Sequence, residues 1–484
     1  MTQVSKLEGI QVSEVVTASP QEIRSTEVLG RVAGLVGEKK FAEVFALIDH
    51  AVTADPQNGD LLNARGYVFT AMGNHAEALK WYRNALKLSP IAAGIWNNLG
   101  TAFTRLKYFK AAIACHQRAI SLSGDEAFAH HNLGLAYSEA GLHGEAIAAF
   151  TRALDLDHGF HLARWDRARS YLFLGNYELG WADYEVRLTT GQVPKRAIQA
   201  AKWDGRPYAG KRLVLLAEQG FGDTIWVLRY LKQVKALGGE LFVECQPALV
   251  SLVAWMQIAD RVIPLGEIIP ETDLYCHLCS LPSILFRDFS LFPGQAYISP
   301  PQGPSRKLRP LLERAGQNLK VGIVWSGSVT FDRNESRALP LQRLLQAIDF
   351  PNVQLYSLQK GPPEKELAAL NHDQSVIDLS PELKDFSYTA AAVSQLDLII
   401  MTDSAVAHLA GALGKPVWVL LGHAAHWLWL LNREDSPWYP SMRLFRPRVE
   451  GDWDYVLDKV AVELMALTSA LGPDPTQNSG ELDL

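Results

Sequence analysis

A period of 34 residues runs through the first part of the chain and constrains its fold more than any other feature. Four sets of small or aromatic residues recur at this spacing. They are Gly66, Gly100, Gly134 and Ala168; Phe69, Phe103, Tyr137 and Tyr171; Ala78, Ala112, Ala146 and Gly180; and Tyr82, His116, Phe150 and Tyr184. Such a period predicts one small helical unit per repeat, and these units bury their apolar faces by stacking on one another.

The pattern resembles the tetratricopeptide repeat, in which each unit is a helical hairpin. The small residue lets the first helix approach the second, and the aromatic residue fills the space between them. We therefore expect nearly all of the aromatic positions, His116 included, to be core. The concave surface is left to bind an extended peptide or a partner protein. Arg187 stands where the pattern has alanine, so we expect the last unit to face a different neighbour, the next domain.

From Trp203 onward, short apolar runs alternate with helical segments at the spacing of βαβ units, which predicts parallel sheets. The alternation restarts near residue 320, after a stretch rich in Pro, Gly and Ser (287–310), so two similar α/β lobes are expected. The predicted divisions are a candidate disordered segment (1–28), about five repeats of which the first is degenerate (29–192), two Rossmann-like lobes (205–305 and 318–470) and a disordered tail (472–484).

Individual strands and helices can also be predicted from the apolar pattern. In the first lobe, strands are expected at 213–216, 241–245 and 261–265, and helices at 224–237 and 247–256. In the second lobe, strands are expected at 320–325, 353–358, 376–378 and 417–421, and a helix at 341–348.

Composition excludes several classes of protein. With 484 residues, 48% hydrophobic and 20% charged, the chain has the composition of a globular protein of several domains. A net charge of −6 and the lack of a basic groove argue against a nucleic-acid partner. No apolar run reaches the ~20 residues of a transmembrane segment, and the first residues lack the pattern of a signal peptide, so a cytoplasmic location is expected.

The four cysteines agree with a reducing compartment. Cys115 and Cys245 stand in helix-like and strand-like contexts, where small buried residues belong. Cys276 and Cys279 form a CHLC motif, but no second pair follows at the spacing of a zinc site. We therefore predict four buried thiols and no metal site.

The segment 396–421 carries the strongest functional signal. An apolar run ends at Thr402, Asp403 and Ser404, and a helix of small residues follows before a second strand. The free amides at the start of that helix, together with its dipole, favour an anion such as a diphosphate. The site would lie at the carboxyl end of a strand, where open α/β sheets bind ligands.

Other candidate site residues follow strands in the same way. In the first lobe, Gly220 and Gly222 permit close approach of the backbone, and Asp223 would project into a cleft, although an aspartate here is also an ordinary helix cap. In the second lobe, Ser326, Gly327 and Ser328 suit phosphate oxygens or form a plain turn. Lys360 could steady a diphosphate or be a solvated lysine, and His408 could face the cleft or bond within the core.

The Gly220–Asp223 turn and the segment TDSAVAHLAGALGKPVWVLLG together resemble the glycosyltransferase family that contains the lipopolysaccharide heptosyltransferases. The resemblance covers about residues 205–465 and is similar to the branch in which tetratricopeptide repeats precede the transferase. It implies a metal-independent, inverting enzyme of the two-lobed GT-B type, without a cofactor. The donor is a nucleotide-diphosphate sugar bound by the second lobe, and the acceptor binds the first.

Position by position, the resemblance makes Asp223 the general base and assigns Asp403 and Ser404 to the donor's phosphates. Arg337 matches the place of a basic residue that precedes the family's second-lobe helix. Gly220, Gly222, Ser326, Gly327, Ser328, Lys360 and His408 complete the expected diphosphate-binding set. The chain has Ala405 where heptosyltransferases have glycine after their acidic turn, so ADP-heptose is not implied as the donor.

Two alternatives to this transferase remain open. Protein O-linked N-acetylglucosamine transferases also join tetratricopeptide repeats to a two-lobed transferase, and their acceptor is a protein side chain. A scaffold of repeats with an inactive transferase unit predicts instead that Asp223 is buried or faces away from the second lobe. The aromatic block of Trp427, Trp429, Trp438 and Tyr439 is either a packed cluster at the sheet edge or a platform for a sugar or a base.

Overall fold

The computed structural model describes residues 20–470 except 192, 194–195, 197, 289–295, 301–305, 331–333, 371–374 and 424, with side chains from residue 27. The chain divides into two compact units, Met1–Val186 and Arg187–Leu484. Most of the expected N-terminal segment, much of the stretch 287–310 and the expected tail lie outside the described residues.

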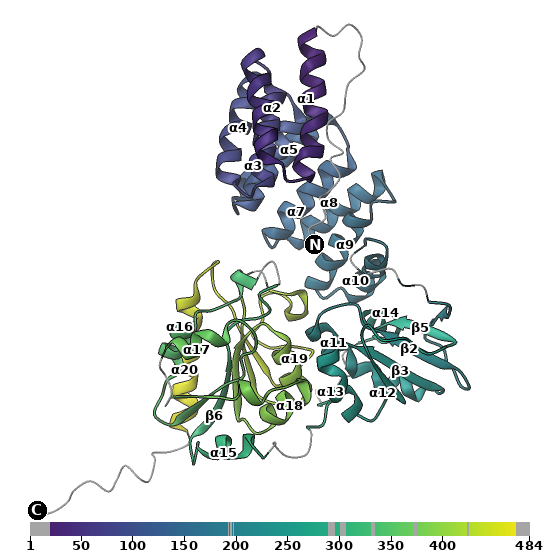
Figure 1. The fold of residues 1–484 in the computed structure, drawn as a ribbon, viewed down its shortest axis with the longest axis vertical. Coiled ribbons are helices and arrows are strands. Elements are labelled where there is room, and N and C mark those ends of the chain that lie inside the picture. The colour runs from purple at the N-terminus through teal and green to yellow at the C-terminus, as the bar shows by residue number, and fades with distance from the viewer. Residues whose placement is uncertain are drawn as a thin grey trace, which may run out of the picture. The chain divides into compact units, whose positions relative to one another are not determined.

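The N-terminal unit is a stack of helical hairpins (Figure 1). The hairpins are α1(Pro20–Gly37) with α2(Phe41–Ala54), α3(Gly59–Ala71) with α4(His75–Leu88), α5(Ala93–Arg105) with α6(Phe109–Ser123), α7(Ala127–Glu139) with α8(His143–Leu156), and α9(His161–Phe173) with α10(Tyr177–Tyr184). The predicted repeat architecture is confirmed.

The recurring glycines and rings meet inside the hairpins, as the period predicts. A Cβ added at Gly66 would lie 2.5 Å from the Tyr82 ring, and one at Gly134 would lie 2.5 Å from the Phe150 ring. In the third repeat a histidine takes the place of the aromatic ring. A Cβ added at Gly100 would lie 2.8 Å from the His116 ring. His116 is 1% exposed, so its reading as a core residue is confirmed.

The C-terminal unit contains two parallel sheets. The first has the strand order β1(Ala201–Lys202), β5(Leu274–His277), β2(Arg212–Leu216), β3(Glu240–Cys245) and β4(Arg261–Pro264). Its helices include α11(Phe221–Val227), α12(Leu231–Ala236), α13(Val250–Trp255) and α14(Leu281–Leu285). The single helix expected at 224–237 is instead interrupted by a 3₁₀ turn at Leu228–Tyr230.

The second sheet has the order β11(Met442–Phe445), β10(Val417–Leu420), β9(Leu398–Thr402), β6(Leu319–Val324), β7(Val353–Ser357) and β8(Val376–Asp378). Its helices are α15(Leu308–Glu313), α16(Leu341–Ile348), α17(Glu364–Ala369), α18(Phe386–Ser394), α19(Ala405–Ala412) and α20(Trp453–Ser469) (Figure 1). One face is packed by α16 and α20, whose Leu344, Ile348 and Val460 are buried against Val321 and Ile400.

The two sheets are joined by direct packing of α11 on α19 and by the aromatic block. Trp427, Trp429, Trp438 and Tyr439 are each at most 4% exposed. The Trp226 ring, from the first sheet's helices, lies 5.1 Å from Trp438 in an edge-to-face arrangement. The block is therefore a packed cluster between the sheets, and its reading as an open platform for a sugar or a base is wrong.

A buried arginine lies in the same cluster. Arg229 donates to the carbonyl oxygens of Trp226 at 2.8 Å and Trp438 at 3.1 Å. Its guanidinium also lies 4.9 Å from the Tyr297 ring centroid and 4.7 Å from that of Tyr439. Backbone oxygens and aromatic faces together hold this desolvated guanidinium. Because Trp226 belongs to α11 and Trp438 lies between β10 and β11, the arginine links the two sheets.

The predicted burial of the four cysteines is confirmed, and each is a free thiol. In the described part of the chain, no helix has both the length and the apolar character needed to span a membrane.

Candidate functional site

Each parallel sheet has a topological switch point, the place in the strand order where open α/β sheets bind their ligands. In the first sheet this point lies between β2 and β5, and in the second between β6 and β9. The predicted residues Gly220–Asp223 follow β2, whereas Ser326–Ser328 follow β6 and Asp403–Ser404 follow β9. The sequence thus places three of its candidate segments at the edges where ligands of such sheets bind.

Asp223 lies in the first turn of α11, and its Oδ2 accepts a hydrogen bond from the Gly220 amide at 3.2 Å. The carboxylate thus caps its helix, which was the alternative reading of this residue. Burial raises the pKa of Asp223 to about 6, and the nearby Asp403 carboxylate adds to that rise against the opposing Gly220 hydrogen bond. Because α11 packs on α19, this carboxylate lies near the acidic turn of the second sheet.

Asp403 directly follows β9 and is 8% exposed. Burial raises the pKa of Asp403, while the Arg337 guanidinium and the Trp429 indole lower it. The next residue, Ser404, is the N-cap of α19 in an extended conformation, but its side chain makes no capping bond. Within the described structure, the buried hydroxyl oxygens of Thr402 and Ser404 have no hydrogen-bond partner.

The turn after β6 is held by the side chain of Gln359, a buried residue that follows the neighbouring strand β7. The Gln359 side chain accepts from the amides of Trp325 and Ser326 at 3.1 and 3.0 Å, and it donates to the Ser326 carbonyl at 3.1 Å. Gly327 lies against Arg337, since an added Cβ would stand 2.5 Å from the guanidinium. This glycine therefore lets Arg337 approach the backbone at the end of β6, near Asp403.

Asn334 links the same turn to the arginine. Its Nδ2 donates to the Ser326 hydroxyl at 3.1 Å, and its Oδ1 accepts from Arg337 Nε at 3.2 Å. Ser326 is buried and bonded in this way, whereas Ser328 is exposed and bonds the Thr330 hydroxyl at 2.8 Å. No role was predicted for Asn334 from the sequence. Its only signal in the sequence is that a polar residue stands three positions before Arg337.

Lys360 does not join this group. Its ammonium donates to the Ser380 carbonyl at 3.0 Å and lies 3.6 Å from the Glu364 carboxylate. The cation is thus directed to the end of β8 and to its own loop. A diphosphate would have to compete with both contacts, so the structure offers no support for Lys360 as a donor ligand.

His408 lies in the core, so its expected role as a diphosphate ligand is wrong. It is 6% exposed, its Nδ1 lies 3.0 Å from the Tyr439 hydroxyl, and its ring stacks on Trp429. Burial lowers the pKa of His408 to about 3, with smaller contributions from nearby cations. A neutral, enclosed imidazole cannot supply charge to a phosphate.

Gly222 packs on the same histidine. A Cβ at residue 222 would lie 2.8 Å from His408 Cδ2 and 3.7 Å from Ala405 Cα. The glycine therefore allows α11 to approach the start of α19, and it serves helix packing where a phosphate contact was expected. Gly220 faces Asp223 and precedes α11.

A buried ion pair supports the loop that carries Asp223. Arg187, with no exposed side-chain area, donates to Glu218 Oε1 at 2.8 Å and to the Ser280 hydroxyl at 2.8 Å. The Cys279 amide also donates to Glu218 Oε1, at 3.1 Å. Glu218 was not predicted as important. Its signal is a charged residue between the apolar run 213–217 and a glycine turn.

Among the residues that the structure describes, no three His, Cys, Asp or Glu side chains lie together as metal ligands would.

Comparisons with known proteins identify the N-terminal unit. A family model described as TPR repeat matches residues 66–107, and one described as tetratricopeptide repeat matches residues 91–158. The chain is 30% identical over 328 residues to Protein FlbA of Caulobacter vibrioides, across 62% of this chain and 54% of that protein. The chain therefore spans about half the length of this curated relative.

Solved structures with similarity to the chain include two repeat proteins. The crystal structure of MamA shares 23% identity over 36% of this chain and 95% of its own, with a TM-score of 0.30. TTC0263, a thermophilic TPR protein of Thermus thermophilus, shares 21% identity over 34% of this chain and 91% of its own, with a TM-score of 0.31. By its family matches, this chain carries tetratricopeptide repeats, and an α/β unit with two parallel sheets follows them.

Proposed function

We propose that the C-terminal unit is an inverting glycosyltransferase that uses a nucleotide-diphosphate sugar. The observation that supports this best is the packing of α11, the helix after β2 that carries Asp223, on the start of α19, where a Cβ added at Gly222 would lie 3.7 Å from Ala405 Cα. The carboxylate base then follows a strand of the first sheet, and the helix N-terminus follows a strand of the second sheet. Sugar transfer needs these two functions on opposite sides of the reacting carbon.

Asp223 is the proposed base. As the acceptor hydroxyl attacks the anomeric carbon, its proton passes to the carboxylate and a new C–O bond forms. The bond from that carbon to the diphosphate breaks, and its electron pair leaves with the diphosphate. A pKa near 6 suits this role, because the group is ionised at neutral pH and still basic enough to take a proton.

The start of α19 and Arg337 are proposed to stabilise the departing diphosphate. The unpartnered hydroxyl of Ser404 and the first amides of α19 can donate to phosphate oxygens. Arg337, held by Asn334, adds positive charge beside Asp403 and offsets that carboxylate. Ser326 and Gly327 shape this side of the site, whereas the positions of Lys360 and His408 remove them from it.

The acceptor is proposed to be a saccharide or a protein selected by the repeats. A repeat array presents an extended surface to a partner polypeptide, which supports selection of the acceptor by residues other than those proposed for the transfer step. Polar side chains link successive first helices, with Asn98 donating to Asn63 at 3.0 Å and Asn132 donating to Asn97 at 2.9 Å.

A panel of UDP-, GDP- and ADP-sugars tests this function. A true donor at a hundred times its Kd should stabilise the folded protein by about 2.7 kcal/mol and raise the Tm. The same sugar should then support release of nucleotide diphosphate when an acceptor is present. Stabilisation by one donor with release of its nucleotide diphosphate is the expected result.

A scaffold without transferase activity is the second candidate, and one observation favours it. The contact of Gly222 with His408 brings α11 and α19 together next to Asp223, which leaves the base partly buried. In that case none of the nucleotide sugars should change the Tm. The transferase proposal fails if no nucleotide sugar of the panel raises the Tm and none supports release of nucleotide diphosphate.

A further inference from the structure

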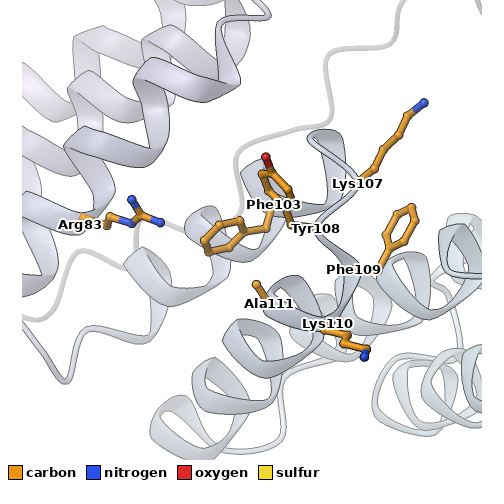
Figure 2. Close-up of a pocket in the computed structure, with 7 residues that line it drawn as sticks. All are labelled: Arg83, Phe103, Lys107, Tyr108, Phe109, Lys110 and Ala111. Atoms are coloured by element: carbon orange, nitrogen blue, oxygen red, sulfur yellow. The ribbon is translucent and has the colours of Figure 1, made fainter.

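The repeat unit contains a groove outside its core. It has a volume of about 750 Å³ and is formed by the turn between α5 and α6 together with α4 of the preceding hairpin (Figure 2). Three of its lining residues are cations, Arg83, Lys107 and Lys110, and none is acidic. This local positive charge contrasts with the net charge of −6 on the chain.

Aromatic rings form the apolar part of the groove. Tyr108 is a large exposed side chain, 60% accessible, and its ring packs edge-on to Phe103 with centroids 6.2 Å apart. Arg83 points toward these rings, with its guanidinium carbon 5.8 Å from the Phe103 centroid (Figure 2). Phe109 is a further ring in the lining. The groove can therefore bind an anionic group and an apolar side chain together.

The turn that forms this groove departs from the equivalent turns of the second, fourth and fifth hairpins. Lys107 has a φ of +65°, a left-handed conformation that favours glycine. At the equivalent positions of the second, fourth and fifth hairpins stand Gly73, Gly141 and Gly175, each with positive φ. The first hairpin also has a lysine there, Lys39. The third repeat therefore keeps a strained lysine where glycine would serve the fold better.

Two more choices in this turn oppose local stability. Tyr108 occupies the N-cap of α6 without a capping bond, whereas Asn74 and Asn176 cap α4 and α10 through their side chains. The first turn of α6 has no acidic residue and carries Lys110 instead. The other second helices all have a glutamate in that turn, namely Glu43, Glu77, Glu145 and Glu178. A cation near a helix N-terminus is unfavourable.

We propose that this groove binds an acidic segment of a partner polypeptide that carries an aromatic or large aliphatic side chain. The three cations of the lining complement carboxylates, and the exposed Tyr108 ring with the half-buried rings of Phe103 and Phe109 accommodates the apolar side chain. The volume is that of a site for a few residues. A nucleic acid is the less favoured occupant, since three cations are few for a phosphate backbone and the chain as a whole is acidic.

Fluorescence anisotropy with the full chain tests the proposal. The probe is a fluorescein-labelled peptide of sequence Glu-Asp-Phe-Glu-Asp-Phe-Glu-Asp, compared with peptides that have Ser for the acids or Ala for Phe, and with oligothymidylate. The wild-type chain is expected to bind the first peptide at least about tenfold more tightly than the others.

Substitutions taken from the other repeats separate binding from folding. Lys107→Gly and Tyr108→Asn should each weaken peptide binding by about tenfold or more, while raising the Tm of the repeat unit by about 2–4 °C. Leu142→Ala, at the position equivalent to Tyr108 in the next repeat, is the matched control and should leave peptide binding unchanged.

Three results would overturn the proposal. They are no anisotropy change at the highest soluble peptide concentration, undiminished binding by Lys107→Gly and Tyr108→Asn, and tighter binding of oligothymidylate than of the acidic peptide. The last result would assign the groove to a nucleic acid.

Discussion

Gly222 of α11 lies directly against the ring of His408 on α19, where an added Cβ would stand 2.8 Å from Cδ2. His408 cannot move aside easily, because it bonds Tyr439 and stacks on Trp429. The distance between α11, which carries Asp223, and α19 therefore depends on the absence of a side chain at residue 222.

Gly222→Ala should force α11 away from α19 and reduce both stability and turnover. Overpacking of this kind costs about 1–3 kcal/mol, which urea unfolding can measure. Gly220→Ala is the matched control, because its added Cβ would meet only Asp223 Oδ2 at 3.4 Å. Equal free energies of unfolding for the two variants would show that α11 and α19 are not closely packed at residue 222.

Gly134→Ala should destabilise the repeat unit. Its added Cβ would lie 2.5 Å from the Phe150 ring, and the expected loss in free energy of unfolding is about 1–3 kcal/mol. Gly144→Ala is the control within the same hairpin, since nothing lies within 4 Å of its added Cβ. It should be neutral or slightly stabilising, as alanine favours helix. Similar unfolding midpoints for both variants would contradict the close packing of α7 on α8.

The repeat unit should lose stability in mild acid because of His116. Burial lowers the pKa of His116 to about 4, below the value of the unfolded chain, so the unfolded state binds a proton first as the pH falls below about 6.5. This single group should reduce the free energy of unfolding by about 2 kcal/mol between pH 7 and pH 5.

His116→Phe, which copies the residue of the next repeat, should remove that part of the acid sensitivity. His143, whose pKa burial also lowers to about 4, keeps its own share. Urea unfolding at the two pH values compares wild type with the variant. An unchanged loss between pH 7 and pH 5 would mean that His116 is not neutral and buried.

Arg187→Met should destabilise the C-terminal unit by about 3–5 kcal/mol, because it leaves the Glu218 carboxylate buried without its cation. The exposed pair of Lys80 with Glu77 provides the comparison. Lys80→Met should change the free energy of unfolding by less than about 1 kcal/mol. Denaturant unfolding followed by far-UV circular dichroism measures both, and equal small effects would show that Arg187 is not a structural support.

The repeat architecture could be predicted from the sequence because the period itself fixes which residues meet. A glycine at 66 or 134 and a ring sixteen residues later in the chain must face each other once each repeat forms a hairpin. The strands at 353–358 and 376–378 and the helix at 341–348 also matched closely, since each is a continuous or strictly periodic apolar run.

Contacts between segments distant in sequence could not be predicted in the same way. The helix expected at 224–237 is interrupted where Arg229 turns to bond Trp438, a residue about two hundred positions away. The short strands β1 and β5 exist only through their pairing with each other and with β2. Asp223 and Asp403 come after β2 and β9, as the alternation of strands and helices predicts, but only packing decides that His408 is core and that Lys360 bonds Ser380.

The acid limb of the pH profile tests the assignment of the base. With a pKa of about 6 for Asp223, turnover should rise as the pH increases through that value and then level off. Asp403→Asn removes a neighbouring negative charge, so it should lower the pKa of Asp223 and move the acid limb to lower pH. An acid limb that stays in place would show that another group titrates.

Release of nucleotide diphosphate by Asp223→Asn is the most direct measurement, made with the sugar nucleotide that stabilises the wild-type chain. We expect the variant to retain nucleotide binding, as judged by the same rise in Tm, and to lose at least about 10²-fold in turnover. Wild-type rates of release from the variant would contradict the proposal that this carboxylate takes the acceptor's proton.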